Sequence, residues 1–134
     1  MLETKVDPLA LARDIVRAYL DTMEARDLVR AKRFLAPGFA MTFPGGQRFT
    51  TIEAVVEWAK PRYRLCKKRY ERFDAAQGPI GTHVYCFGTL YGEWPDGAPF
   101  EGIRFIDRFT VRAGKLVDQM VWNDMGEARA GGKS

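Results

Sequence analysis

The spacing of apolar residues predicts helices in the first half of the chain and strands in the second. The first helix is indicated by apolar residues at roughly helical spacing: Leu11, Ile15, Ala18 and Met23. Asp7 and Pro8 precede them as an N-cap and a first-turn proline. A second helix is expected from Asp27 to about Phe34, and a third from Thr50 or Thr51 to Ala59.

The rest of the chain alternates between apolar and polar residues, which is the pattern of half-buried strands. Strands are predicted at 39–43, 67–76, 80–94, 100–112 and 115–125. Turn residues separate the last four strands, as in hairpins between antiparallel neighbours. Three helices followed by such a meander predict an α+β, cone-shaped fold. In this fold, three N-terminal helices pack on a strongly curved antiparallel sheet and enclose a pocket.

The length of 134 residues fits one domain, which we assign to residues 1–129, followed by a flexible tail at 130–134. No apolar run approaches the ~18 residues of a membrane span. Met1 to Asp7 lack the basic start and apolar stretch of a secretory signal, so a cytoplasmic location is expected. The two cysteines, Cys66 and Cys86, lack metal-ligand spacing, and no metal site is expected.

The net charge of +4 is modest, but seven of the thirteen residues from Lys60 to Arg72 are basic. With Tyr63 and Tyr70 interleaved, this run could bind nucleic acid through phosphates and stacked bases. The same run could instead be a solvated helix end that leads into an exposed strand, since basic residues are favoured at a helix C-terminus. The second interpretation is the more common one, and nucleic acid is not expected as a partner.

Two residues far apart in the sequence, Tyr19 and Asp107, are the strongest candidates for chemistry. Tyr19 lies among the apolar positions of the first predicted helix. Asp107 shares the apolar face of its strand with Phe105 and Phe109. A buried carboxyl group needs a partner, or its pKa rises. The two residues could form the polar end of a pocket, or Asp107 could be a satisfied structural acid.

The order of elements resembles the nuclear-transport-factor-2-like (NTF2-like) superfamily, which includes steroid delta-isomerases, limonene epoxide hydrolases and SnoaL-type polyketide cyclases. The closing segment is similar to the last hairpin of that group: Ile106-Asp107-Arg108-Phe109, Gly114-Lys115-Leu116 and Val121-Trp122. The resemblance covers nearly the whole chain. Its motifs are loose, so it implies the fold more strongly than the chemistry.

Within the superfamily, the steroid isomerase pattern can be laid along residues 19–46 without a gap. This resemblance implies that Tyr19 is an oxyanion-hole tyrosine and that Asp107 is the acid that the isomerase keeps neutral to donate a hydrogen bond. Pro44 falls on the proline after the catalytic base, but the base position itself holds Phe43. A phenyl ring cannot take up a proton, so the resemblance does not imply the isomerase reaction in its usual form.

His83 is the only histidine and could replace the missing base, although it could also be a packed or interface residue. We expect Phe43, Trp58, Ile103 and Phe105 to line a mostly apolar cavity. The resemblance places Gln119 and Asn123 on the pocket face of the last strand.

Two other chemistries fit the sequence poorly. In the epoxide hydrolases of this superfamily, water activation needs an arginine between two acids, in an arginine-x-aspartate arrangement. Arg104 and Asp107 are three residues apart on one strand and face opposite sides, which breaks that arrangement. The Gly45-Gly46 turn lacks the lysine and hydroxyl group of a nucleotide phosphate loop. No cofactor is therefore expected.

We predict a SnoaL-like protein that binds a small, mostly apolar carbonyl or phenolic ligand. The chemistry open to it is that of an isomerase, cyclase or hydratase that acts through an enolate-like state, with His83 or a pocket water as the base. The alternative is a non-catalytic dimeric module that binds a ligand or a protein. In either case a homodimer is expected through the outer face of the sheet, which carries Tyr85, Phe87, Met120 and Trp122.

Overall fold

The computed structural model describes residues 7–131. Within these residues it contains the helices α1 (Pro8–Glu24), α2 (Leu28–Lys32), α3 (Ile52–Ala59) and α4 (Met125–Gly131), with a 3₁₀ turn at Pro44–Gly46. The predicted caps are present. The Asp7 carboxylate accepts the backbone N–H of Leu9 at 2.9 Å, and the Thr51 hydroxyl accepts that of Ala54 at 3.2 Å. The three predicted N-terminal helices are confirmed.

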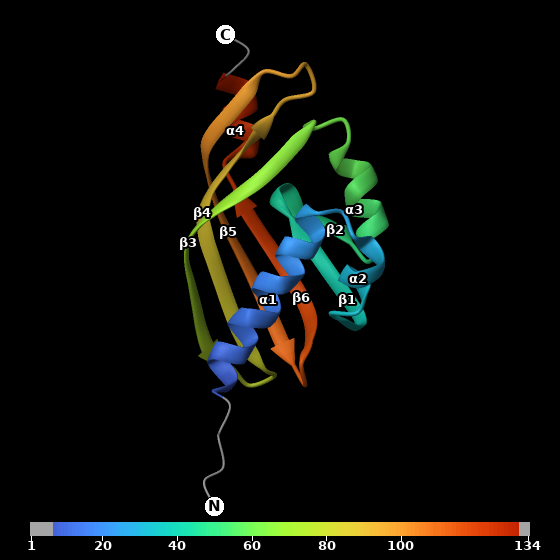
Figure 1. The fold of residues 1–134 in the computed structure, drawn as a ribbon, viewed down its shortest axis with the longest axis vertical. Helices are drawn as coiled ribbons and strands as arrows, with labels where there is room; N and C mark the ends of the chain where they lie inside the picture. The colour runs from blue at the N-terminus through green and yellow to red at the C-terminus, as the bar shows by residue number, and fades with distance from the viewer. Residues whose placement is uncertain (1–6, 132–134) are drawn as a thin grey trace, which may run out of the picture.

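The strands form one six-stranded sheet in the order β2-β1-β6-β5-β4-β3 (Figure 1). Their bounds are β1 (Leu35–Phe43), β2 (Gln47–Phe49), β3 (Leu65–Gln77), β4 (Thr82–Glu93), β5 (Pro99–Arg112) and β6 (Lys115–Asn123). Strands β3 to β6 form the predicted antiparallel meander. The first and last strands, β1 and β6, lie side by side and parallel, so the sheet is mixed at that one position.

The elements differ from the prediction near both ends of the chain. Strand β1 begins at Leu35 rather than residue 39, and an irregularity in its pairing with β6 accommodates the proline and glycine at 37 and 38. The last strand ends at Asn123, whose side chain accepts the backbone N–H of Met125 at 3.1 Å and precedes α4. Helix α4 includes the first two residues of the predicted tail, and residues 132–134 lie outside the part that the structure describes.

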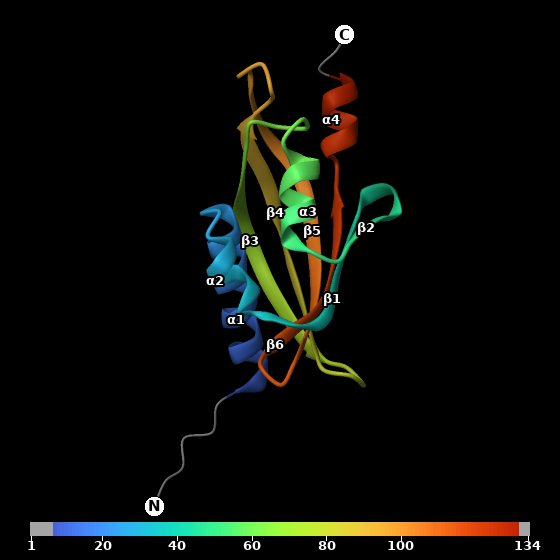
Figure 2. The same cartoon turned by 90° about the vertical axis from the view of Figure 1, so that its right-hand side faces the viewer.

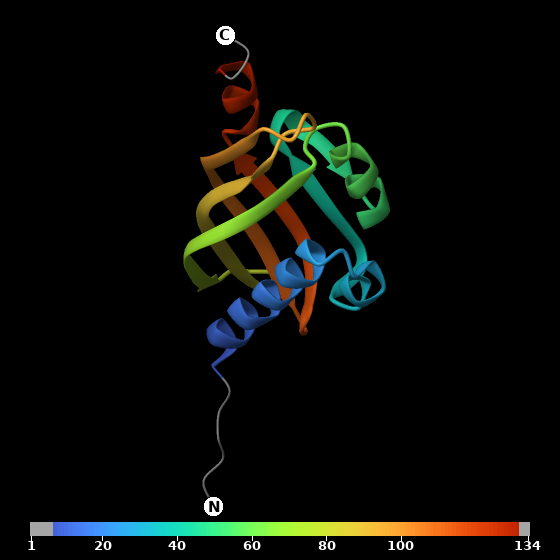
Figure 3. The same ribbon diagram turned by 45° about the horizontal axis from the view of Figure 1, so that its top comes forward.

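The sheet is strongly curved, and α1 lies across its concave side (Figure 3). Helix α1 contacts β3 and β4, while α2 and α3 continue the helical layer toward β2 (Figure 2). Irregular pairing in β3–β4 and in β4–β5 accompanies the bend, as expected for β-bulges. Gly88 permits the close approach there, since a Cβ at this position would lie 2.0 Å from the carbonyl oxygen of Arg69. The predicted α+β cone is therefore confirmed.

The core lies between α1 and the concave face of the sheet. Its largest fully buried side chains include Tyr19, Met41, Ile52 and Phe109, which come from α1, β1, α3 and β5. Each side chain occupies the apolar face that its element presents to the other layer. In the region from 7 to 131, no helix has the length and apolar character that crossing a membrane requires.

Candidate functional site

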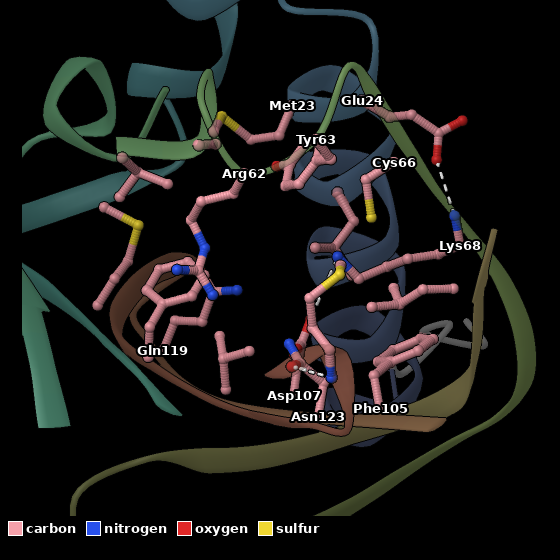
Figure 4. A pocket seen from close by; sticks show the side chains of 18 of the residues that line it. Met23, Glu24, Arg62, Tyr63, Cys66, Lys68, Phe105, Asp107, Gln119 and Asn123 are labelled. Atoms are coloured by element: carbon pink, nitrogen blue, oxygen red, sulfur yellow. Dashed lines mark hydrogen bonds and ion pairs between the residues drawn. The ribbon is translucent and has the colours of Figure 1, made fainter. Parts of the chain in front are cut away.

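A cavity of about 130 Å³ lies between the helices and the concave face of the sheet. Its walls come from α1, β1, α3, β3, β5 and β6, so it joins residues from both ends of the chain (Figure 4). An apolar cavity of roughly this volume takes up benzene in an engineered protein. The space in the molecule therefore suits a ligand with about one enclosed aromatic ring.

Tyr19 lines the cavity and is 1% exposed. Its ring is fixed by edge contacts with Phe34, Phe39 and Phe109, with centroid distances of 6.1, 6.2 and 5.9 Å. The hydroxyl group has no hydrogen-bond partner among residues 7–131. Burial raises the pKa of Tyr19 well above its usual value, so the group stays a neutral phenol and an available donor.

Asp107 enters the same cavity from β5 and is also 1% exposed. Both of its carboxylate oxygens are buried without a hydrogen-bond partner in the described part of the chain. The nearest charge is the ammonium group of Lys68, with 3.6 Å between Nζ and Oδ2. Burial raises the pKa of Asp107, and Lys68 opposes that rise only in part.

Lys68 is a cavity residue that the sequence did not indicate as part of the site. It lies on β3, two positions from both Cys66 and Tyr70, and its side chain is 26% exposed. Burial, the largest single effect, would lower the pKa of Lys68. The attraction of Asp107, with smaller contributions from Tyr70, Cys66 and Cys86, reverses this, so the pKa is raised and the ammonium group stays charged. The alternation of Lys68 with Cys66 and Tyr70 was a usable signal, because it places the lysine on the inner face of its strand.

The wall of the cavity nearest α3 is aromatic. Phe43 packs on Trp58 with 5.0 Å between ring centroids, and Phe49 contacts both rings at 5.7 and 5.3 Å. Phe43 and Trp58 line the cavity as predicted. Phe43 is therefore part of an apolar wall at the position where the isomerase pattern has its base, and it supplies surface for a flat ligand.

The other predicted site residues are divided between the cavity and the surrounding core. Phe105, Gln119 and Asn123 line the cavity (Figure 4). Ile103 is buried but is not part of the cavity wall. His83 is also absent from the wall, because its strand position places its ring against Thr110, with 3.2 Å between Nδ1 and Oγ1. The structure therefore does not bring His83 together with Tyr19 and Asp107.

Most of the basic residues at 60–72 form ion pairs with carboxylates of the same chain. Five of its seven cations have a carboxylate within 4.0 Å: Lys60, Arg64, Lys68, Arg69 and Arg72. Four of these pairs lie at the surface, where each contributes little to stability. Only the pair formed by Lys68 is buried at the carboxylate end.

The predicted separation of Arg104 from Asp107 is confirmed. Arg104 bonds Asp124 on the outer surface, with 2.6 Å between Nε and Oδ2, whereas Asp107 points into the cavity. Among the residues that the structure describes, no group of three or more His, Cys, Asp or Glu side chains is arranged to hold a metal ion.

Comparison with protein families matches residues 16–119 to a model described as a SnoaL-like domain. A search of the curated proteins found no match. Among solved structures, an NTF2-like protein of unknown function from Burkholderia pseudomallei K96243 is similar with a TM-score of 0.77 and 17% identity, covering 90% of this chain and 95% of that one.

Two further solved structures have the same fold. TerC, crystallised with polyporic acid, has a TM-score of 0.74 and 16% identity, with 90% of this chain and 97% of that chain covered. A proposed SnoaL-like polyketide cyclase from Jannaschia sp. CCS1 has a TM-score of 0.69 and 16% identity, with 96% of each chain covered. At these identities the similarity establishes the shared fold alone.

Proposed function

Because the chain belongs to the SnoaL-like domain family, within the NTF2-like superfamily, we propose that it binds a small, mostly apolar phenolic or carbonyl compound in its cavity. The observation that carries this proposal is the buried group formed by Tyr19, Lys68 and Asp107 in a cavity that also has an aromatic wall. Buried polar atoms without protein partners are costly, and a ligand oxygen would satisfy them.

The three side chains have complementary roles in this proposal. The ammonium group of Lys68 and the hydroxyl group of Tyr19 donate hydrogen bonds to the ligand oxygen. The proton of a bound phenol, or the proton next to a bound carbonyl group, moves to the Asp107 carboxylate. Its raised pKa suits this step, because the protonated carboxyl is the form that burial favours. The new carboxylic acid then donates to the oxygen anion, as the protonated acid does in the steroid isomerase pattern.

The same arrangement supports isomerisation, cyclisation or hydration through an enolate-like state. Asp107 takes the place of His83 as the proposed proton carrier, because His83 does not line the cavity. Among the structural neighbours are the Jannaschia polyketide cyclase assignment and TerC, which was crystallised with a small organic compound. These neighbours agree with a small-molecule role for the cavity.

The proposed site is tested by measuring the affinity for 2-naphthol by isothermal titration calorimetry. We expect Tyr19→Phe, which removes one oxygen atom, to weaken binding about 2- to 10-fold. Lys68→Met should weaken it about 10- to 100-fold, because a charged hydrogen bond is lost. Arg30→Gln is the control, since Arg30 is exposed on α2 and does not line the cavity. A folded wild type that binds neither 2-naphthol nor phenol would contradict the proposal.

A second candidate function is a dimeric interaction module, and the outer face of the sheet favours it. This outer patch consists of Tyr85, Ile106, Met120 and Trp122, whose exposed fractions are 36–52%. Ile106 and Trp122 are directly opposed across β5 and β6. Contiguous apolar surface of this kind marks an interaction site, and we propose that a second copy of the chain covers it.

A further inference from the structure

Arg62 lies on the cavity wall opposite Lys68 and is held in place by aromatic side chains. It follows α3, and its guanidinium carbon lies 4.3 Å from the ring centroid of Trp58. Trp58 is in turn packed against Phe43 and Phe49. A guanidinium that stacks through its flat face keeps the N–H groups at its edge free to donate. The aromatic wall therefore positions Arg62 with its donors available.

Arg62 is unlike its neighbours in having no carboxylate partner in the described range. Lys60 pairs with Glu57 at 2.6 Å and Arg64 with Glu93 at 3.8 Å, but no ion pair between residues 7 and 131 includes Arg62. Burial lowers the pKa of Arg62, and the like charge of Arg129 on α4 lowers it further. A partly buried cation beside a second cation is a site that favours an anion.

The positions of the charges around the cavity indicate how a ligand would be oriented in it. In Figure 4, Arg62 and Lys68 extend into the cavity from opposite walls. Lys68 already has Asp107 as its partner at 3.6 Å. Arg26 also lines the cavity, and its guanidinium donates to the backbone carbonyl of Met23. Among the cavity cations in the described part of the chain, Arg62 is therefore the one with neither a carboxylate nor a side-chain hydrogen-bond partner. An elongated ligand between the two walls would therefore meet an anion-binding group at one end and the proton-accepting group at the other.

We propose that Arg62 binds a carboxylate of the ligand, and that the natural ligand is a small aromatic acid with its phenol or carbonyl oxygen at Tyr19, Lys68 and Asp107. A planar carboxylate matches the guanidinium edge and can accept two parallel hydrogen bonds from it. The position of the second oxygen rests on the proposed function, whereas the carboxylate subsite rests on Arg62 itself.

Binding of matched compounds with and without a carboxylate tests this subsite. The pairs are 4-hydroxybenzoate with phenol and 6-hydroxy-2-naphthoate with 2-naphthol, so that ring size is varied separately from charge. Calorimetric titration of the wild type should give tighter binding for the acid in at least one pair, by about 10- to 100-fold. Arg62→Gln should remove that advantage and leave binding of the neutral phenol within about threefold.

Two further variants and a folding check complete the test. Arg62→Lys keeps the charge without the bidentate edge and should retain part of the advantage, while Arg30→Gln removes an exposed charge and should retain all of it. Circular dichroism and thermal melting establish that each variant is folded. If the wild type binds acid and neutral phenol equally, or Arg62→Gln keeps the preference, the carboxylate subsite is wrong and the proposed function stands. If the folded wild type binds no member of either pair, both are wrong.

Discussion

At the scale of single residues, the site depends on a buried carboxyl group that has one charged neighbour. Asp107 was identifiable from the sequence, because an acid on the apolar face of a strand is unusual. Its partner was harder to identify, since Lys68 lies in a run of basic residues and most of those residues form ion pairs at the surface. Only the alternation of Lys68 with Cys66 and Tyr70 distinguished it, and Asp107 itself required such a partner.

The raised pKa of Asp107 predicts a pH dependence of stability. A folded-state pKa above the unfolded value means that the native protein binds this proton more tightly than the unfolded chain. The associated stability is complete below the unfolded pKa, near 3.8, and is lost as the pH rises through the folded value. The loss is about 1.4 kcal/mol for each unit of difference between the two pKa values. Lys68 stays charged from pH 4 to 8 in both states, so it adds no slope there.

Urea unfolding of the wild type and Asp107→Asn between pH 4 and 8 measures this effect. The unfolding free energy of the wild type should fall relative to that of the variant as the pH rises, since asparagine does not titrate. The opposite trend would be a rise in the unfolding free energy of the wild type relative to that of the variant as the pH increases above 4. It would mean that Lys68 holds the pKa of Asp107 below its ordinary value.

At the scale of elements, the helices and the meander were predictable, but the edges of the sheet were not. Periodicity and caps specify α1 and α3 locally. In contrast, β1 extends through a proline and a glycine because it pairs with β6, some eighty residues later in the chain. Strand β2 has only three residues, too few to show a period. Both features depend on tertiary pairing, which local patterns do not encode.

The outer patch on β4, β5 and β6 leads to a prediction about assembly. We expect the wild type to be a dimer in analytical ultracentrifugation, and Trp122→Glu to raise the dimer Kd at least about tenfold, because it places a charge among buried apolar groups. Val29→Glu is the control, since Val29 is 70% exposed on α2, away from this patch. If the wild type is a monomer, or if the two variants have the same dimer Kd, the outer patch is not a dimer interface.

At the scale of the whole molecule, the curved sheet makes one enclosed space out of distant segments. The cone predicted from the order of elements placed Tyr19, Phe43 and Asp107 around a common interior, and all three line the cavity. The cone could not indicate how far along each strand that interior extends. His83 and Ile103 were therefore assigned to the pocket on strand position alone, and neither lines it. Strand curvature, set by bulges such as that beside Gly88, decides this boundary.

In the proposed mechanism, the cavity takes up the proton of a bound phenol and stabilises the resulting anion. The most direct measurement is the absorption spectrum of bound 2-naphthol at neutral pH, which reports its ionisation in the ground state. We predict a phenolate spectrum in the wild type and a largely neutral naphthol spectrum in Asp107→Asn and Lys68→Met. A neutral naphthol in the wild type, or the same phenolate fraction in all three proteins, would mean that Asp107 and Lys68 do not ionise the bound phenol.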